Sequence, residues 1–231
     1  MLKLYIGNKN YSSWSMRPWV LLKQTGIPFE EAMVRFDSFD AESNFKQTLA
    51  GTSPTGKVPV LVDSATTPPT VVWDTLSIAE YLAEKHPHLN LWPTAAPARA
   101  VARSICAEMH GGFTALRSAC PMNIEAQLPE VGGLIWRDNA SVRQDVARLS
   151  QMWEALLNQH GGPCLFGNFS IPDAYFAPVC MRLHTYALPV SPAVTAYVDA
   201  VRNLPGVQAW TDEALAEKDF LAFEEPYRLH R

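Results

Sequence analysis

The chain contains the segment Tyr11-Ser12-Ser13-Trp14-Ser15-Met16-Arg17-Pro18, which closely follows a short apolar run at residues 2–6. Helix-like spacing of apolar residues begins at Ser15 and continues to Gln24, and Gly26 supplies a stop signal. A strand therefore leads into a serine cluster at the start of a helix. Hydroxyl groups and free backbone N–H groups at such a position can bind an anion.

A second pair of segments lies further along the chain. Gly56-Lys57-Val58-Pro59-Val60-Leu61 can offer an extended edge to a peptide-like ligand, and Trp73-Asp74-Thr75 opens an amphipathic pattern over 75–85. An Asp-Thr pair at a helix start can bind the other end of that ligand. Each segment also has a structural interpretation, because serine and aspartate are common in loops and helix caps.

The order of the predicted elements divides the chain into an α/β part and an all-α part. The first part, residues 1–86, reads β-α-β-α-β-β-α, which is typical of a thioredoxin-like domain; the second, residues 94–231, is helical. The Pro-containing stretch between them is a predicted linker. The predicted strands are 2–6, 29–36, 58–62 and 70–73, and the predicted helices are 15–24, 40–49, 75–85, 95–119, 139–159, 172–187, 192–203 and 206–217.

Composition excludes several classes of protein. With 19 basic and 23 acidic residues, the formal charge of −4 argues against a nucleic-acid-binding protein. No apolar run approaches the roughly 18 residues of a membrane span, and no signal-peptide pattern is present, so we expect a cytoplasmic protein. The cysteines form no metal-ligand spacing, and we expect buried free thiols and no metal. They are Cys106, Cys120, Cys164 and Cys180.

Together the serine segment, the Val-Pro segment and the Asp-Thr helix start resemble the glutathione transferase superfamily, and most closely its serine-using, zeta-like members. The pattern Ser-Ser-x-Ser-x-Arg of those members is met by residues 12–17, although Trp14 stands where a cysteine often occurs, and Pro18-Trp19 also depart from their pattern. The resemblance implies an N-terminal thioredoxin-like domain followed by an all-helical domain. It also implies a homodimer that uses glutathione as co-substrate.

The resemblance assigns roles to the serines. Ser12 matches the residue that contacts the glutathione sulfur, Ser13 matches its neighbour, and Tyr11 is a rival donor because other classes use tyrosine. A free thiol titrates near about pH 8.5, so most of it is protonated at neutral pH. A hydroxyl hydrogen bond and the positive end of a helix dipole both favour the thiolate.

The same resemblance places glutathione along the other segments. Pro59 is expected to follow a cis bond that turns the backbone of Val58 toward the ligand. Asp74 and Thr75 match the pair that holds the γ-glutamyl end. Lys57 is a candidate for the glycine carboxylate, as is Lys46, and both can equally be solvated surface lysines.

The pocket for the electrophile is less well marked in the sequence. We expect it between the domains, lined by the helix predicted over 95–119, on which Met109, His110, Phe113 and Arg117 are spaced to share a face. Such a stripe is also typical of a core. Arg182 is a further candidate for contact with an acidic substrate. Ser170-Ile171-Pro172-Asp173 predicts a capped helix start with a structural role.

These observations predict a glutathione transferase in which a serine hydroxyl activates the thiolate for attack on a small electrophile. Two alternatives stay open: a glutathione-dependent cis-trans isomerase of the maleylacetoacetate type, and a non-catalytic binding module with the same fold. The identity of the electrophile is set by loops and by the helical domain, and fold does not determine it.

Overall fold

The computed structural model describes residues 1–231 and contains one four-stranded sheet in the order β2-β1-β3-β4. β1 and β2 run parallel, whereas β3 is antiparallel to both β1 and β4. Leu2, Leu4 and Ile6 of β1 are buried while the residues between them are partly exposed, which is the alternation that a strand with one covered face requires. The strands are β1 (Leu2–Ile6), β2 (Phe29–Met33), β3 (Val60–Asp63) and β4 (Thr70–Trp73).

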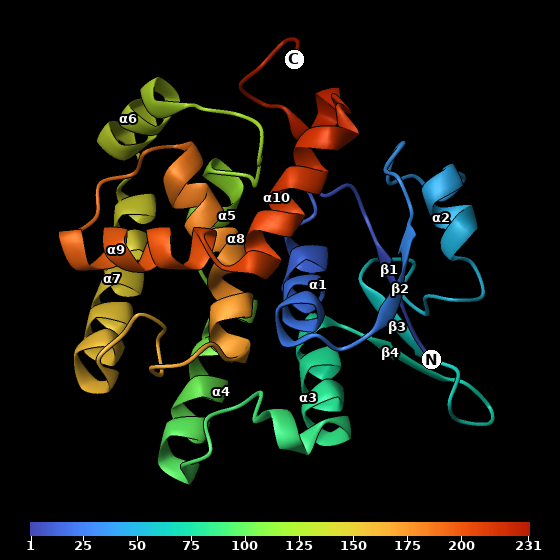
Figure 1. Ribbon diagram of the computed structural model, residues 1–231. Helices are drawn as coiled ribbons and strands as arrows, with labels where there is room; N and C mark the ends of the chain where they lie inside the picture. Colours follow the sequence, from blue (N-terminus) through green and yellow to red (C-terminus); the bar gives the residue numbers. More distant parts are fainter.

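Helices cover both faces of this sheet. α1 (Ser13–Thr25) and α3 (Thr75–Lys85) lie between the sheet and the rest of the molecule, and α2 (Asn44–Leu49) lies on the other side (Figure 1). α1 ends at Gly26, whose φ of 69° is the left-handed conformation that glycine adopts at little cost. The arrangement confirms the predicted thioredoxin-like fold.

All further regular structure is helical, which confirms the predicted α/β plus all-α fold class. α8 is buried along nearly its whole length and packs against α1, α4 and α9. A single core of 47 buried residues runs from Leu4 of β1 to Trp210 of α10, so the two parts share one hydrophobic interior. The helical elements are η1 (Pro87–Leu89), α4 (Ala96–Gly111), α5 (Thr114–Ala119), α6 (Pro129–Asp138), α7 (Ala140–His160), α8 (Ile171–Thr185), α9 (Pro192–Arg202), α10 (Pro205–Glu217) and η2 (Ala222–Glu224).

Two predictions about the helices were wrong. The helix predicted over 95–119 is two helices, because the chain breaks at Gly112 and Phe113 takes a left-handed φ of 54°. α6 was missed, since its two central glycines lower helix propensity. Gly132 is required there: a Cβ at this position would lie 1.7 Å from the carbonyl oxygen of Tyr186.

Some element bounds also differ from the prediction. β2 ends at Met33 rather than at residue 36, and β3 begins at Val60 rather than at residue 58. β3 starts late because Pro59 has no N–H to give to a strand ladder. The short helix predicted from residue 40 begins at Asn44, where the side chain of Ser43 caps it.

The start of α8 is fixed by a buried carboxylate. Asp173 accepts hydrogen bonds from the backbone N–H of Ser170 at 2.9 Å, from that of Leu165 at 3.0 Å and from the hydroxyl of Tyr197 at 3.2 Å. The predicted capping role of this residue is therefore confirmed. Because α8 contributes side chains to the site described below, Asp173 supports that site from a distance.

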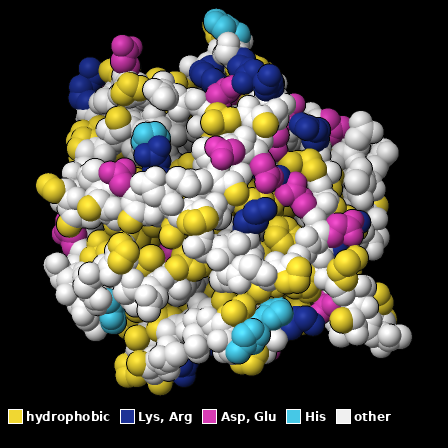
Figure 2. All heavy atoms as spheres, in the orientation of Figure 1, with side chains coloured by type: hydrophobic (Ala, Val, Ile, Leu, Met, Phe, Trp, Pro, Cys, Tyr) yellow, Lys and Arg dark blue, Asp and Glu magenta, His cyan; other side chains and the backbone are white.

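The surface and the cysteines can be described in the same terms as the composition. Lys and Arg side chains are scattered among Asp and Glu on the face shown in Figure 2, without a continuous basic patch. None of the helices is both long and apolar enough to cross a bilayer. The four cysteines are buried free thiols, as predicted, and no group of three or more metal-ligating side chains occurs.

Candidate active site

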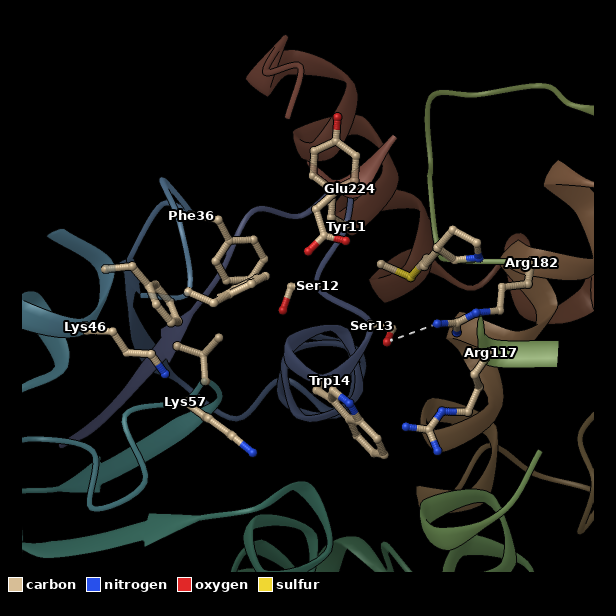
Figure 3. A pocket seen from close by; sticks show the side chains of 15 residues that line it. Tyr11, Ser12, Ser13, Trp14, Phe36, Lys46, Lys57, Arg117, Arg182 and Glu224 are labelled. Atoms are coloured by element: carbon tan, nitrogen blue, oxygen red, sulfur yellow. Dashed lines mark hydrogen bonds between the residues drawn. The ribbon is translucent and has the colours of Figure 1, made fainter. Parts of the chain in front are cut away.

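Two neighbouring cavities of about 400 Å³ each lie along the N-terminal end of α1. Trp14, Lys57 and Val58 line both of them. We name them the Asp74 cavity and the Ser12 cavity. The Asp74 cavity is further lined by Thr55, Pro59, Trp73, Asp74, Thr75 and His110. The Ser12 cavity (Figure 3) is further lined by Tyr11, Ser12, Ser13, Phe36, Phe39, Phe45, Lys46, Arg117, Pro121, Met122, Arg182 and Glu224.

The two serines at the start of α1 differ in their partners. Ser12 is the N-cap residue, yet its side chain makes no capping bond and instead donates to the hydroxyl oxygen of Ser15 at 2.7 Å. Ser15 in turn accepts from the backbone N–H of Gly7 at 3.1 Å. The hydroxyl of Ser13 accepts from Arg182 at 3.3 Å. Ser12 therefore belongs to a hydroxyl pair within the N-terminal part, and Ser13 faces the helical part.

The hydroxyl of Tyr11 is already hydrogen-bonded within the protein. It donates to the buried carboxylate of Glu225 at 2.7 Å. Burial, and then this hydrogen bond, raise the pKa of Tyr11 to about 12. In this arrangement the hydrogen of the phenol is directed to Glu225 rather than into the cavity.

The segment around Pro59 lies between the two cavities. The Val58–Pro59 bond is cis, as expected. Lys46 donates to the backbone carbonyl of Gly56 at 2.7 Å, which ties α2 to this loop, while Lys57 makes no ion pair. Both ammonium groups line the Ser12 cavity on the wall of the N-terminal part (Figure 3).

The start of α3 is tied to the helical part across the Asp74 cavity. Asp74 takes a φ of 75° and caps α3 by accepting from the N–H of Leu76 at 2.8 Å. Its second carboxylate oxygen lies 3.3 Å from Nε2 of His110. The hydroxyl of Tyr175 lies 2.7 Å from Nδ1 of His110 and 2.8 Å from the hydroxyl of Thr75.

Thr75 presents its backbone more freely than its side chain. Its hydroxyl is paired with that of Tyr175 at 2.8 Å. Its backbone N–H is the first of α3 and has no acceptor within the helix. The cap itself is Asp74 rather than Thr75.

Three arginines without a carboxylate partner lie near the start of α1: Arg17 and Arg117 against the Trp14 ring, and Arg182 at Ser13. Arg17 lies 4.2 Å from the centroid of the Trp14 ring, and Arg117 lies 4.9 Å from it. Arg17 and Arg182 are 2% and 5% exposed, yet neither has an ion pair. Arg17 donates to the carbonyl groups of Ser13 and Tyr175, and Arg182 to those of Cys120 and Pro178.

Burial of this positive charge is reflected in the pKa values. Burial, and next the neighbouring Arg117, lower the pKa of Arg182 to about 10, and burial lowers that of Arg17 to about 9. Burying a charge without a counter-charge is unfavourable. An anion in the Ser12 cavity would offset that cost.

All seven predicted site residues line these cavities. Ser12, Ser13, Lys57 and Val58 lie at the Ser12 cavity, and Pro59, Asp74 and Thr75 at the other. The four residues predicted to share one face of a helix lie in different places, because the break at Gly112 divides that face. Arg117 lines the Ser12 cavity and His110 lines the Asp74 cavity. Met109 and Phe113 are buried in the core.

Several lining residues gave no signal in the sequence. The aromatic wall of Phe36, Phe39 and Phe45 follows no periodic pattern, although their rings stack edge to face at centroid distances of 5.1–6.0 Å. Glu224 comes from far along the chain, as does Tyr175, which bonds to the lining residues Thr75 and His110. Only the hydroxyl of Ser15, in the same motif as Ser12, could have been singled out from its position.

Known proteins resemble this chain in sequence and in structure. The family model described as "Glutathione S-transferase, N-terminal domain" matches residues 11–85. The "Probable maleylacetoacetate isomerase" of Caenorhabditis elegans is 28% identical over 194 residues, 83% of each chain. The structure of a glutathione transferase homolog from Burkholderia GL BGR1, with bound glutathione, is 25% identical with a TM-score of 0.68, covering 93% of this chain and 98% of that one.

A further solved structure shares the fold at lower identity. Maleyl pyruvate isomerase, described as a bacterial glutathione-S-transferase in zeta class, has 20% identity and a TM-score of 0.66, covering 92% of this chain and 97% of that one. These similarities agree with the resemblance carried by the serine and Val-Pro segments. Residues 11–85 thus match the N-terminal domain of glutathione S-transferases, and the whole chain has the fold of solved glutathione transferases.

Proposed function

We propose that the protein binds glutathione across the two cavities and transfers it, as a thiolate, to a small electrophile. The observation that carries this proposal is the shared wall of Lys57 and Val58, which joins the Asp74 cavity to the Ser12 cavity. Asp74 would bind the γ-glutamyl ammonium group, and the N–H of Thr75 its carboxylate. The backbone of Val58 would bind the cysteinyl part, and Lys57 and Lys46 the glycine carboxylate.

In this proposal Ser12 activates the thiol. A hydroxyl can rotate, so the Ser12–Ser15 pair has a second arrangement in which Ser15 donates to Ser12. The Ser12 hydrogen is then available to a sulfur in the cavity. The positive end of α1 acts in the same direction. A fall of one pKa unit in the bound thiol requires about 1.4 kcal/mol, which a charge-assisted hydrogen bond can supply.

The thiolate would attack an electrophile held against the aromatic wall and Met122. A carbon–sulfur bond forms; the displaced electron pair departs with a leaving group or, in an activated double bond, moves from the π bond onto the activating group, and the resulting enolate takes up a proton from water. Holding both reactants in one site also lowers the entropic cost of their encounter. The cytoplasmic homodimer implied by the resemblance is part of the same proposal.

A second candidate is a glutathione-dependent cis-trans isomerase, and the unpaired arginines favour it. The thiolate adds to a double bond, the resulting single bond rotates, and elimination returns the thiolate, so no glutathione is consumed. Arg182 and Arg117 lie where a carboxylate on the substrate would neutralise them. Two relatives named above as isomerases of maleylacetoacetate and maleyl pyruvate motivate this alternative.

The two candidates are separated by following glutathione itself. The protein is incubated with glutathione and, in separate reactions, an epoxide, a chloroaromatic, an organic peroxide and a cis-dienone that carries a carboxylate. Loss of glutathione with formation of a conjugate supports the transferase. Isomerisation of the cis-dienone at constant glutathione supports the isomerase. Absence of both, with no calorimetric signal for glutathione, contradicts the proposed function.

A further inference from the structure

The residues that follow α10 form a strap beside the Ser12 cavity, and Glu224 of this strap lines the cavity. We define this strap as residues 218–231. It is anchored by Glu225, whose buried carboxylate accepts from Tyr11 at 2.7 Å, from Asn123 at 2.9 Å and from Arg228 at 2.5 Å. Although burial alone would raise the pKa of Glu225, the hydrogen bonds from Arg228 and Tyr11 hold it below its usual value.

Glu225 connects the two parts of the molecule through the strap. Tyr11 belongs to the N-terminal part, whereas Asn123 follows α5 in the helical part. Next to this anchor, the hydroxyl of Tyr227 donates to the carbonyl of Ala119 at 2.7 Å. The ring of Phe223 packs edge to face on Phe39 with centroids 5.4 Å apart. The backbone around the anchor is therefore fixed on both sides.

The neighbouring glutamate has no such partners. Glu224 ends the turn η2 and makes neither a side-chain hydrogen bond nor an ion pair, although its side chain is half-buried in the cavity wall. Figure 3 shows its carboxylate directed into the cavity, on the side of Ser12. Burial, and then the charge of Glu225, raise the pKa of Glu224. The carboxylate has no protein donor and is partly shielded from water, so a donor group on a ligand in the cavity can pair with it.

Glu224 is also the one acidic residue in this wall. The other charged residues of the Ser12 cavity are Lys46, Lys57, Arg117 and Arg182, all of them basic. In the binding mode proposed above, the ammonium group of glutathione lies in the other cavity, at Asp74. That leaves the second substrate as the partner of Glu224.

We propose that Glu224 is a specificity-determining residue that binds a hydrogen-bond donor, a hydroxyl or ammonium group, on the second substrate. This inference rests on the proposed function and names the chemistry of its substrate. The preferred electrophile carries its donor group at the strap, and any carboxylate it bears meets Arg117 and Arg182 on the opposite wall. Glu224 is not suited to activate the thiol, because an anionic carboxylate near the sulfur would raise the pKa of the thiol.

The test uses a matched pair of substrates: an aryl enone with a phenolic hydroxyl, and its methyl ether, which keeps the shape but has no donor. For each enzyme we take the ratio of kcat/KM for the hydroxyl compound to that for the ether, so that intrinsic reactivity cancels between enzymes. Glu224→Met keeps the length of the side chain and removes the acceptor. We expect this ratio to fall about tenfold or more in Glu224→Met, since a hydrogen bond to a charged group is lost.

Two control variants isolate the effect. Glu130→Met replaces an exposed glutamate on α6 and should leave the ratio unchanged. Glu225→Gln weakens the anchor of the strap, and should lower kcat/KM for both substrates together without changing their ratio. The inference is overturned if the ratio in Glu224→Met equals that of wild type. It is also overturned if the ratio falls by the same factor in Glu225→Gln as in Glu224→Met.

A binding measurement keeps this test separate from the proposed function. The saturated ketones of the same pair cannot react, and calorimetry compares their affinities in wild type and Glu224→Met. A selective loss of about tenfold for the hydroxyl ketone supports the inference even for a protein that does not turn over glutathione. Equal affinities in both proteins contradict it even for an active transferase.

Discussion

The two cavities differ in how far apart their lining residues lie in the sequence. Apart from Trp14 and His110, all residues that line the Asp74 cavity lie within residues 55–75. They belong to a loop, the end of a strand and the start of a helix. The Ser12 cavity draws its walls from residues 11 to 224. Sequence motifs therefore describe the first cavity well, whereas the second depends on how the helical part and the strap pack against α1.

Their electrostatics differ as well. The Asp74 cavity pairs a carboxylate with His110, and its polar groups already bond to one another. The Ser12 cavity contains guanidinium groups that make no ion pair. We therefore expect the second cavity to select ligands by charge more strongly than the first, and the following variants are chosen to separate the two.

The largest effect is expected from Asp173→Ala, which should damage both cavities at once. Tyr175 of α8 bonds to Thr75 and His110 at the Asp74 cavity, Arg182 of α8 lines the Ser12 cavity, and the buried N–H groups at the start of α8 would lose their acceptor. We expect a loss of about 3 kcal/mol in the free energy of unfolding, measured with urea. Asp138→Ala, at an exposed pair on α6, serves as the control and should change it little.

The same carboxylate gives a pH test. Burial raises the pKa of Asp173 to about 6, above the value of about 3.9 in an unfolded chain. The folded state therefore keeps this proton to a higher pH than the unfolded state does. The stability that protonated Asp173 contributes is lost as the pH rises from about 4 to about 6. Asp173→Asn should remove that contribution to the slope of stability against pH. An identical slope in the variant would contradict the assignment.

Arg182→Gln should affect the Ser12 cavity alone. We expect kcat/KM for a carboxylate-bearing electrophile to fall about 30-fold, or about 2 kcal/mol, because a charge-assisted hydrogen bond is lost. A neutral electrophile and the Kd for glutathione should change little. Arg148→Gln removes an arginine that pairs with Glu108 at the surface, and is the matched control. Equal losses for charged and neutral electrophiles would show that Arg182 supports packing only.

Asp74→Asn should affect the other cavity alone. Asparagine can cap α3 and tolerates the φ of 75°, so the substitution removes the negative charge with little change of fold. We expect calorimetry to show about tenfold weaker glutathione binding, or about 1.4 kcal/mol. The KM for the electrophile should stay near its wild-type value at saturating glutathione. Unchanged glutathione affinity would contradict the γ-glutamyl site.

The sequence predicted the N-terminal part of this site because its contacts are local. Ser12 and Asp74 lie at helix starts, and their neighbours in the chain also position them. Arg182 was visible as a residue, but its approach to Ser13 requires α8 to pack on α1. The helix predicted over 95–119 failed at Gly112 because periodicity reports the spacing of apolar residues and not the break between two helices.

Glu224 could not be predicted at all. It follows the last long helix in a stretch without periodicity, and its position depends on the bond between Tyr11 and Glu225, which are 214 residues apart. Such long-range hydrogen bonds leave no pattern in a single sequence. The strap was therefore absent from the predicted site.

The central claim is that Ser12 stabilises the thiolate of bound glutathione. The most direct measurement is the thiolate absorbance of the glutathione complex against pH, in wild type, Ser12→Ala, Ser13→Ala and Tyr11→Phe. We predict that Ser12→Ala raises the pKa of the bound thiol by about one unit, or about 1.4 kcal/mol, with nearly unchanged affinity for glutathione. Ser13→Ala should raise it less, and Tyr11→Phe should leave it unchanged. A wild-type pKa in Ser12→Ala would contradict the mechanism: a raised pKa in Ser13→Ala or in Tyr11→Phe would then transfer the role to that residue.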